Sequence, residues 1–409
     1  MKKRIFLFVL IYISLFFGRL FSLKKPNYLP GTFVEIVSTL DNEPEILGQT
    51  QRFSLAGFKI KTRRFPEYHY GDVLKIRGKV GHYHTISFPI ISKLNKAGES
   101  GLFSLLFHFR QRWEDLINQN LPFPQSSLLV GMLLGIKNLP YSLSSDLKRS
   151  GLIHLVVASG SNVSLVAAYP LYLSPILGRK TALILSLLAI FLYTLLIGFQ
   201  PPIIRASIMG GLSYLAALFG RQSLSLLTLT LSAALMLLFN PFYLFDLSFQ
   251  LSFLATLGIV LFAPIFLSFL KKLNRGVSTA IATTISAQLF VLPLIVSKFG
   301  QFPLFSLLTN ILVYPIVDPV MILGFPFVFL GVFSQFFSKI FSFFLYFPLT
   351  YFFLIAHYFG NPLFTLRIPK IPFPFFLPYY LFLLLLWQFF QKLFQKKVNI
   401  QTPDRGSRC

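Results

Sequence analysis

The sequence predicts a polytopic α-helical membrane protein of about ten spans, some of which could be re-entrant, with a small all-β domain on the extracytoplasmic side. Hydrophobic residues make up 55% of the 409 residues and charged residues only 12%, and the mean hydropathy is positive. Runs of eighteen or more mostly apolar residues recur, and each can cross roughly 30 Å of hydrocarbon. One polar segment, residues 27–97, shows strand-like runs instead.

Residues 1–23 form the first predicted span. Lys2, Lys3 and Arg4 precede an apolar run, and no small-x-small cleavage site follows it, so we expect an uncleaved anchor. Nine further hydrophobic stretches follow: 150–175, 180–199, 203–220, 223–239, 247–270, 277–299, 303–331, 335–359 and 376–394. Ten spans place both termini on one side of the membrane.

The charges of the loops orient these spans. With the N-terminus in the cytoplasm, thirteen Lys and Arg residues fall on the cytoplasmic side and two in short outer loops, which is the usual bias of membrane proteins. We therefore expect a multi-pass protein of the cell membrane with both termini in the cytoplasm, including the basic tail 396–409, and with the β domain outside. Much of the net charge of +24 then reflects topology. The Pro-rich stretch 303–331 is the span that could instead be re-entrant.

The polar segment contains four short runs rich in Val, Ile and Phe, separated by turn residues, which indicates a small all-β domain. Its most basic run is Lys59-x-Lys61-x-Arg63-Arg64, flanked by Phe58 and Phe65. Cationic side chains could contact a phosphate backbone while the aromatic rings stack on bases, so the four cations and Phe58, with Phe65 beside them, are candidates for binding DNA. A solvated strand face explains the same pattern without a ligand.

Residues 98–141 are predicted to form interfacial helices. Apolar side chains between residues 101 and 120 recur at i, i+3, i+4 and i+7, and Trp113 suits the level of the lipid head groups. The next apolar segment, 126–136, is too short to span and is expected to continue this layer on the membrane lipids. The amphipathic helix could also support a homodimer.

Polar residues inside 151–166 indicate a function within the membrane. His154, Ser159 and Asn162 occur in an otherwise apolar stretch, and Ser159-Gly160-Ser161-Asn162 is where a helix could break. Hydrocarbon tolerates such groups only where they face protein or water, so we interpret the stretch as the wall of a polar path. Small residues packed tightly against a neighbouring helix explain it equally well.

A few polar residues lie within the later spans: Arg205, Asp246, Gln250, Gln288, Asn310 and Asp318. A buried arginine requires a counter-charge or a water-filled cavity, and Asp246 and Asp318 are the only acidic residues between Leu147 and Pro403. One hypothesis is that the polar residues turn toward a shared aqueous cavity. The alternative is a structural Arg–Asp bridge with scattered helix–helix hydrogen bonds.

Several enzyme motifs are missing from the sequence. It contains no G-x-x-x-x-G-K-[ST] and no H-E-x-x-H, and Ser159 with His154 makes a poor i, i+5 pair for an intramembrane hydrolase, without a G-x-S-x-G motif. The only cysteine is Cys409, and His82-x-His84 lacks further ligands. We therefore expect no catalysis, no bound metal and no cofactor.

Three groups of motifs follow one another over roughly residues 150–325: Ser150–Leu155 with Ala158–Gly160, Pro202–Gly210 with Phe245–Phe253, and Gln288–Pro293 with Phe299–Asn310. In this order they resemble the ComEC proteins, the inner-membrane channels for DNA uptake in natural competence. Residues 150–395 then correspond to the competence-type transmembrane domain, and 27–97 resembles the family's oligonucleotide-binding (OB) barrel. One departure is Asn162, which stands where the family usually has a histidine.

The resemblance implies a channel that conducts single-stranded DNA into the cytoplasm during natural transformation, with a cytoplasmic helicase and an outer DNA receptor as partners. The path would be lined by His154, Ser159, Asn162, Arg205, Asp246, Gln250, Gln288 and Asn310. Many members also end in a metallo-β-lactamase-like domain, whose H-x-H-x-D-H motif is absent from this sequence. Two alternatives stay open: a transporter of another anionic or lipid-linked substrate, with the β domain as a structural cap, and an intramembrane hydrolase.

Overall fold

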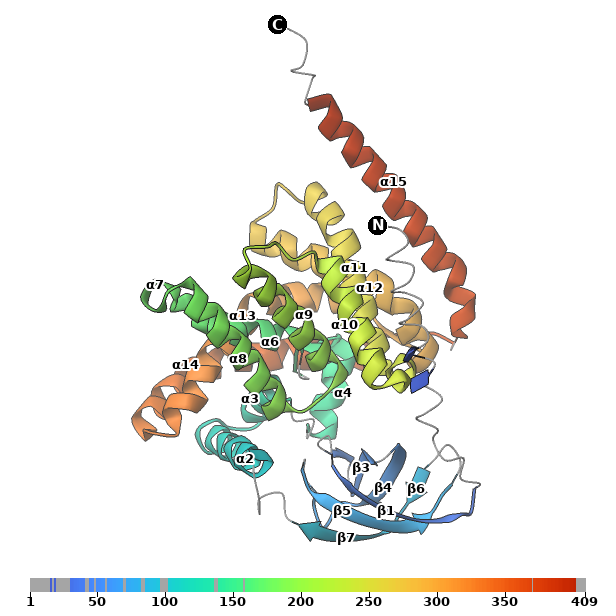
Figure 1. The fold of residues 1–409 in the computed structure, drawn as a ribbon, viewed down its shortest axis with the longest axis vertical. Coiled ribbons are helices and arrows are strands. Elements are labelled where there is room, and N and C mark those ends of the chain that lie inside the picture. The colour runs from blue at the N-terminus through green and yellow to red at the C-terminus, as the bar shows by residue number, and fades with distance from the viewer. Residues whose placement is uncertain are drawn as a thin grey trace, which may run out of the picture.

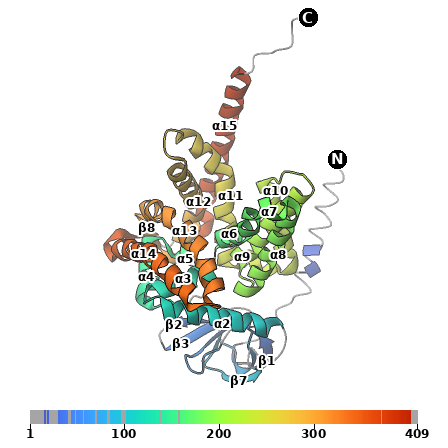
Figure 2. The ribbon, with the colours of Figure 1, turned by 90° about the vertical axis from the view of Figure 1, so that its left-hand side faces the viewer.

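The computed structural model describes residues 15–16, 18–19, 30–40, 44–47, 49–55, 57–68, 71–81, 85–95, 102–135, 139–156, 159–369 and 371–401. A small β domain lies at one end of the molecule, next to a helical body, and helix α15 extends to the opposite end (Figures 1 and 2). The predicted anchor 1–23 lies almost entirely outside the described residues, as do residues 402–409 and His82-x-His84. The predictions for these segments stay predictions.

The β domain consists of two sheets that share one hydrophobic core. The three-stranded sheet has the order β1-β5-β7, and the four-stranded sheet has the order β2-β3-β4-β6. The strands are β1 Phe33–Thr39, β2 Glu45–Leu47, β3 Thr50–Leu55, β4 Phe58–Arg63, β5 Val73–Lys79, β6 Thr85–Ser87 and β7 Ile90–Asn95. Because side chains alternate along a strand, each sheet turns one face inward, and Ile60, Ile76 and Ile86 are buried in the shared core.

The four strand runs predicted at residues 32–39, 52–61, 72–80 and 85–94 are confirmed with three changes, the first of which is that the last run forms two strands, β6 and β7, in different sheets. The run expected from residue 52 to 61 is divided by Gly57, whose φ of +85° is easily adopted only by glycine, so the chain forms the hairpin β3–β4 there. The sequence does not predict β2, because a strand of three residues is too short to show alternation. The two-sheet domain agrees with the expected small all-β domain.

Helix α2 (Leu102–Asn120) is the predicted amphipathic helix. It lies between the helical body and the β domain (Figure 2). Its apolar residues Trp113 and Ile117 are buried in the main helical core, and the Trp113 ring meets the Phe329 ring edge to face at 4.9 Å. Trp113 therefore packs against protein and not at the level of the lipid head groups.

Helix α3 (Gln125–Leu134) corrects the predicted interfacial layer. It is buried inside the helical body, where Leu128, Leu129 and Met132 are fully inaccessible to solvent. It packs against α2, α13 and α14, so it has no face for lipid. The physical reason is that α3 is apolar on all sides after its first turn, so it has no polar face for the membrane surface, and at 10 residues it is too short to span.

Each hydrophobic stretch predicted after residue 150 is helical. The helices from residue 141 onward are α4 Tyr141–Ser150, α5 Ile153–Val156, α6 Gly160–Tyr172, α7 Ser174–Leu177, α8 Arg179–Ile197, α9 Pro201–Leu218, α10 Ser225–Phe239, α11 Leu247–Phe269, α12 Arg275–Phe299, α13 Ser306–Gly331, α14 Gln335–Phe359 and α15 Leu377–Gln401. Short 3₁₀ turns occur at Pro241–Phe245, Pro362–Phe364 and Phe373–Phe376, and β8 (Gln301–Pro303) pairs with β9 (Thr365–Arg367).

Six helical segments among the described residues are long and apolar enough to cross a membrane: Ile153–Tyr172, Arg179–Ile197, Leu247–Phe269, Arg275–Lys298, Ser306–Gly331 and Gln335–Phe359. The stretches predicted at 203–220, 223–239 and 376–394 are helical as α9, α10 and α15 but do not belong to this set. The protein is thus mostly helical with six candidate spans, and the count of ten stays a prediction.

Helix α13 is the Pro-rich stretch that could have been re-entrant. It is one continuous helix of 26 residues, although Pro315, Pro319 and Pro326 lie inside it. Prolines are tolerated in a membrane helix where neighbouring helices surround the freed backbone groups, and α12, α14 and α3 pack against α13. Val313, Phe327 and Val328 place this helix in the main hydrophobic core.

Candidate functional site

The helix break expected near Ser159 is present. Helix α5 ends at Val156, Ser159 has an extended backbone, and α6 begins at Gly160 without a side-chain cap. The Ser159 hydroxyl lies 2.5 Å from the Ser161 hydroxyl and donates to Asn162 Oδ1 at 3.0 Å. The predicted break therefore exposes the amino end of α6 and holds its first polar side chains in one cluster.

Asn162 connects this break to helix α3. The side chain is buried, and its Nδ2 donates to the carbonyl oxygen of Met132 at 2.6 Å. The Tyr193 hydroxyl donates to the next carbonyl, that of Leu133, at 3.1 Å. Both carbonyls belong to the last turn of α3, where the helix itself provides no donors. Asn162 therefore satisfies a buried backbone group and is not turned toward a passage.

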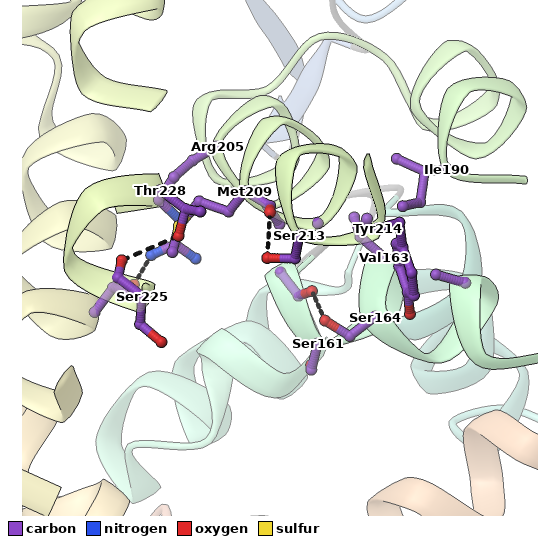
Figure 3. Close-up of a pocket in the computed structure, with 15 residues that line it drawn as sticks. Ser161, Val163, Ser164, Ile190, Arg205, Met209, Ser213, Tyr214, Ser225 and Thr228 are labelled. Carbon is purple, nitrogen blue, oxygen red and sulfur yellow. Dashed lines mark hydrogen bonds between the residues drawn. The ribbon is translucent and has the colours of Figure 1, made fainter. Parts of the chain in front are cut away.

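A cavity of about 390 Å³ opens between helices α6, α8, α9, α10 and α11. It is lined by Gly160, Ser161, Val163, Ser164, Ala167, Ile190, Arg205, Ala206, Met209, Gly210, Ser213, Tyr214, Ser225, Thr228 and Thr256. Figure 3 shows Ser161, Arg205 and Ser213 around this space, on α6 and α9. Hydroxyl groups and one guanidinium are thus brought together inside a body of otherwise apolar helices.

Arg205 is the charged residue of this lining. Its Nη1 donates to the carbonyl oxygen of Ser252 at 2.6 Å and to the hydroxyl of Thr256, while its Nε is buried without a hydrogen-bond partner. A Cβ at position 160 would lie 2.8 Å from Arg205 Nη2, so only glycine lets the guanidinium lie this close to the start of α6. The absence of a side chain at Gly160 is therefore part of the site.

The two intramembrane carboxylates do not neutralise Arg205. In the part of the chain that the structure describes, the salt bridges do not include Arg205. Asp246 instead caps α11, where its Oδ1 accepts from the Phe249 N–H at 2.9 Å, and Asp318 is exposed on α13. The alternative of one structural Arg–Asp bridge is therefore wrong for the described residues.

A second polar cluster joins α12 to the start of α13. Gln288 Nε2 donates to the Ser306 hydroxyl at 2.7 Å, and the Thr309 hydroxyl donates to the carbonyl oxygen of Ser150 at 2.8 Å. Gly151, at φ +80°, presses against Ser306 at this point. Asn310 follows Thr309 on α13, and its Oδ1 is buried without a hydrogen-bond partner. This cluster attaches the turn after α4 to α13.

The eight predicted path residues do not line one cavity, which corrects the hypothesis of a single shared aqueous space. Arg205 lines the cavity described above, and Ser159 is one hydrogen bond away from it through Ser161. His154 is exposed, with Nδ1 2.9 Å from the Gly151 carbonyl oxygen, and Gln250 Nε2 donates to the Leu244 carbonyl oxygen at 2.8 Å. Both side chains thus contact a backbone carbonyl close in sequence, three residues earlier for His154 and six residues earlier for Gln250.

Several cavity residues are missed by sequence reasoning: Ser213, Tyr214, Ser225, Thr228 and Thr256. Serine and threonine in an apolar helix ordinarily donate to the carbonyl four residues earlier, as Ser213 does to Met209 at 2.9 Å. The sequence shows only that serine and threonine residues are frequent on α9 and α10, and this does not indicate which helices lie next to each other.

The predicted basic run on β4 forms an exposed face of the four-stranded sheet. Lys59 and Arg63 are exposed and Lys61 is partly exposed, because alternate residues of a strand share one face. Arg52 on β3 lies opposite Lys61 in the sheet and is also exposed. Arg64, just after the strand, pairs with Glu67 at 3.0 Å. We call Arg52, Lys59, Lys61 and Arg63 the basic face.

Phe58 corrects the predicted stacking residue. Its side chain is only 5% exposed and belongs to the core of the β domain, so its ring cannot stack on a base. Phe65, the other aromatic residue of the predicted run, is 70% exposed, and Phe88, which the sequence does not single out, is 55% exposed. Lys61 lies over the Phe88 ring at 5.7 Å, and Arg64 over the Phe65 ring at 5.3 Å.

Three of the four Lys and Arg residues on the strands of the other sheet are paired with carboxylates, and the fourth, Lys79 at the end of β5, is exposed. Glu35 on β1 accepts from Lys75 at 2.5 Å and from Arg77 at 2.6 Å, and Lys93 lies 2.6 Å from Asp72. The hydrogen bonds from Lys75 and Arg77 lower the pKa of Glu35 from its ordinary value. Within the described residues, the salt bridges include none of the cations of the basic face. Among the described residues, the four cations of the basic face thus have no carboxylate partner, whereas on the strands of the other sheet Lys79 alone has none.

Comparisons with known proteins agree with the motifs in the helical body. The family model described as Competence protein matches residues 132–393, more than half of the 409-residue chain. ComE operon protein 3 of Bacillus subtilis (strain 168) is 33% identical over 170 residues, which is 41% of this chain and 21% of that protein. An uncharacterized protein of Aquifex aeolicus (strain VF5) is 36% identical over 178 residues, 43% of this chain and 41% of that protein.

The matched parts thus cover less than half the length of either relative. No solved structure matches the chain. The family model includes the break at Ser159, the cavity around Arg205 and the cluster at Gln288, so the resemblance and the site coincide. The chain belongs to the competence protein family, the ComEC family.

Proposed function

We propose that the protein takes part in DNA uptake during natural transformation and conducts single-stranded DNA across the cell membrane. The observation that carries the proposal is the cavity at the helix break, where Arg205 has no carboxylate partner among the described residues. A positive charge kept without a counter-ion inside a membrane protein suits a ligand that is negatively charged. Membership of the competence protein family supports the choice of DNA.

In this proposal the β domain, an OB-like domain on the outer side, receives the strand. The basic face contacts phosphates, and the exposed rings of Phe65 and Phe88 stack on bases without sequence preference. The termini lie in the cytoplasm, and an outer DNA receptor and a cytoplasmic helicase act before and after the membrane step. The amphipathic helix α2 is the element through which two copies associate in this proposal.

We propose a conduit and not an enzyme. For an intramembrane serine hydrolase, the Ser159 hydroxyl would be activated by the His154 ring. Among the described residues, Ser159 bonds to Ser161 and Asn162, and His154 bonds to the Gly151 carbonyl. No hydrogen bond joins the serine to the histidine, which favours a non-catalytic role for both.

The proposal is tested by deleting the gene from a naturally competent host. Transformation should fall to the level of a non-competent control, while DNA still binds to the cell surface and stays outside the cytoplasm. Expression of the full chain from a second locus should restore transformation. Normal transformation of the deletion strain, with labelled DNA recovered from the cytoplasm, would end the proposal.

A second candidate is a transporter of a small anion. The cavity volume of about 390 Å³ favours it, since pockets for small ligands range from about 300 to 1,000 Å³. In that case the β domain is a structural cap and the basic face has no part in transport. The two candidates are therefore separated by oligonucleotide binding, which should depend on Lys59 and Lys61 only if DNA is the substrate.

A further inference from the structure

Among the described residues, no carboxylate forms a salt bridge with the charged group inside the cavity. Arg205 lines the cavity, and its two nearest polar contacts, the Ser252 carbonyl and the Thr256 hydroxyl, carry no charge. Only Nη1 is used by these contacts, while Nη2 lies beside Gly160 at the cavity wall. A guanidinium presents donors in a planar fork that suits two oxygens of a phosphate. Arg205 thus has donor capacity left for an oxyanion.

The amino end of α6 adds to the same positive potential. Gly160 and Ser161 are the first residues of this 13-residue helix, and both line the cavity. The first N–H groups of a helix lack intrahelical acceptors, and Ser159 provides no side-chain cap to them, although its carbonyl oxygen accepts from the Asn162 N–H at 3.2 Å. Gly160 lies next to Arg205, since a Cβ at position 160 would come within 2.8 Å of the guanidinium. The helix dipole and the arginine therefore favour an anion at one point of the cavity.

We infer that this cavity binds one phosphate group, as a monoester or a diester, between the Arg205 guanidinium and the amino end of α6. Ser225 and Thr228 of α10 line the same space, which is where we place the sugar and base attached to the phosphate. The inference rests on the proposed function in one respect: it takes the phosphate to come from the backbone of the DNA strand that crosses the membrane. A free nucleotide offers the same chemistry, so the experiment includes both sources.

The test uses the full chain in lipid nanodiscs and measures binding of thymidine 5′-monophosphate and thymidine by equilibrium dialysis. The wild-type chain should prefer the monophosphate by about tenfold or more, because a charged hydrogen-bonded pair is worth at least that factor. Arg205→Gln should abolish this preference, and Arg205→Lys should retain part of it. Arg221→Gln is the matched control, since Arg221 is exposed after α9 and does not line the cavity.

Equal binding of the two ligands by the wild-type chain, or of the monophosphate by the wild-type and Arg205→Gln chains, would overturn the inference. Retained monophosphate preference in Arg205→Lys shows that the fold tolerates substitution here. Competition by a twelve-residue oligothymidylate separates the sources. Displacement of the monophosphate assigns the site to the DNA backbone. If the oligomer does not compete, the phosphate site stands and its assignment to a DNA path is overturned. If the monophosphate is not bound in preference to thymidine, the phosphate site is overturned, but the gene-deletion test of DNA uptake is unaffected.

Discussion

Asn162 shows how one buried side chain holds the helix break in place. It donates to the Met132 carbonyl and accepts from the Ser159 hydroxyl, so it ties α6 to α3 and orders the exposed residues before it. The family usually has a histidine here, and the amide performs a task that depends on hydrogen bonding and not on titration. Arg205, by contrast, keeps its charge uncompensated. The two polar residues lie close to the same break but serve structure and ligand respectively.

Replacing Asn162 by Ala should lower the free energy of unfolding by about 1–3 kcal/mol, because the Met132 carbonyl loses its donor inside the protein. The measurement is reversible unfolding of the purified full chain in detergent. Ser164→Ala is the control, since the Ser164 hydroxyl is exposed and makes only a 3.4 Å contact with the Gly160 carbonyl. Equal stability of the two variants would show that Asn162 does not hold the break.

At the scale of elements, α11 and α12 form the closest helix pair in the body. Gly258 on α11 faces the backbone of α12 so closely that a Cβ there would collide with the Ser286 carbonyl oxygen and lie 2.8 Å from a Phe290 ring carbon. Small residues let membrane helices approach in this way. The pair carries Thr256, which orients Arg205, and Gln288, which joins α13. The spacing of α11 and α12 therefore determines the shape of the site.

Gly258→Ala should destabilise the protein by about 1–3 kcal/mol, because a rigid backbone group leaves no room for the added methyl. Thermal unfolding in detergent measures the effect as a fall in the melting temperature. Gly211→Ala on α9 is the matched control, since nothing lies within 4 Å of its Cβ position. A melting temperature for Gly258→Ala at or above that of the control contradicts this account of the packing.

At the scale of the whole molecule, positive charge is distributed unevenly over the β domain. The sheet with β4 carries the basic face, whereas the sheet with β5 pairs Lys75 and Arg77 with Glu35. Cations already paired with a carboxylate release few counter-ions when a polyanion approaches, so the basic face should dominate binding. In the proposed function, the β domain and the cavity of the helical body both bind the same anionic strand.

Lys59→Gln with Lys61→Gln should weaken binding of oligothymidylate to the full chain and reduce the slope of log K against log salt by about 1.4, roughly 0.7 for each lost phosphate contact. Fluorescence anisotropy across a salt series measures this slope. Lys75→Gln with Arg77→Gln removes the same number of charges from the paired sheet and should change the slope less. Identical slopes in both double variants would favour the small-anion transporter.

The local structure follows from the sequence because its causes are local. Apolar runs predict the helices after residue 150, and period-two alternation places Lys59 and Arg63 on one strand face. The Ser159-Gly160-Ser161-Asn162 run predicts the helix break, because polar and small residues there cannot continue a lipid-facing helix. The motifs around Arg205 also suffice to predict the family, which the family model confirms.

Tertiary structure alone decided which residues meet. Phe58 precedes the basic run in sequence, yet the register of β4 turns it into the core. α3 reads as a short interfacial segment, but surrounding helices bury it. Arg205 lies beside Gly160 because α6 packs against α9, and Asp246 caps α11 instead of pairing with it. The physical reason is that a sequence encodes the periodicity of each element, whereas the neighbours of each face depend on contacts between segments far apart in the chain.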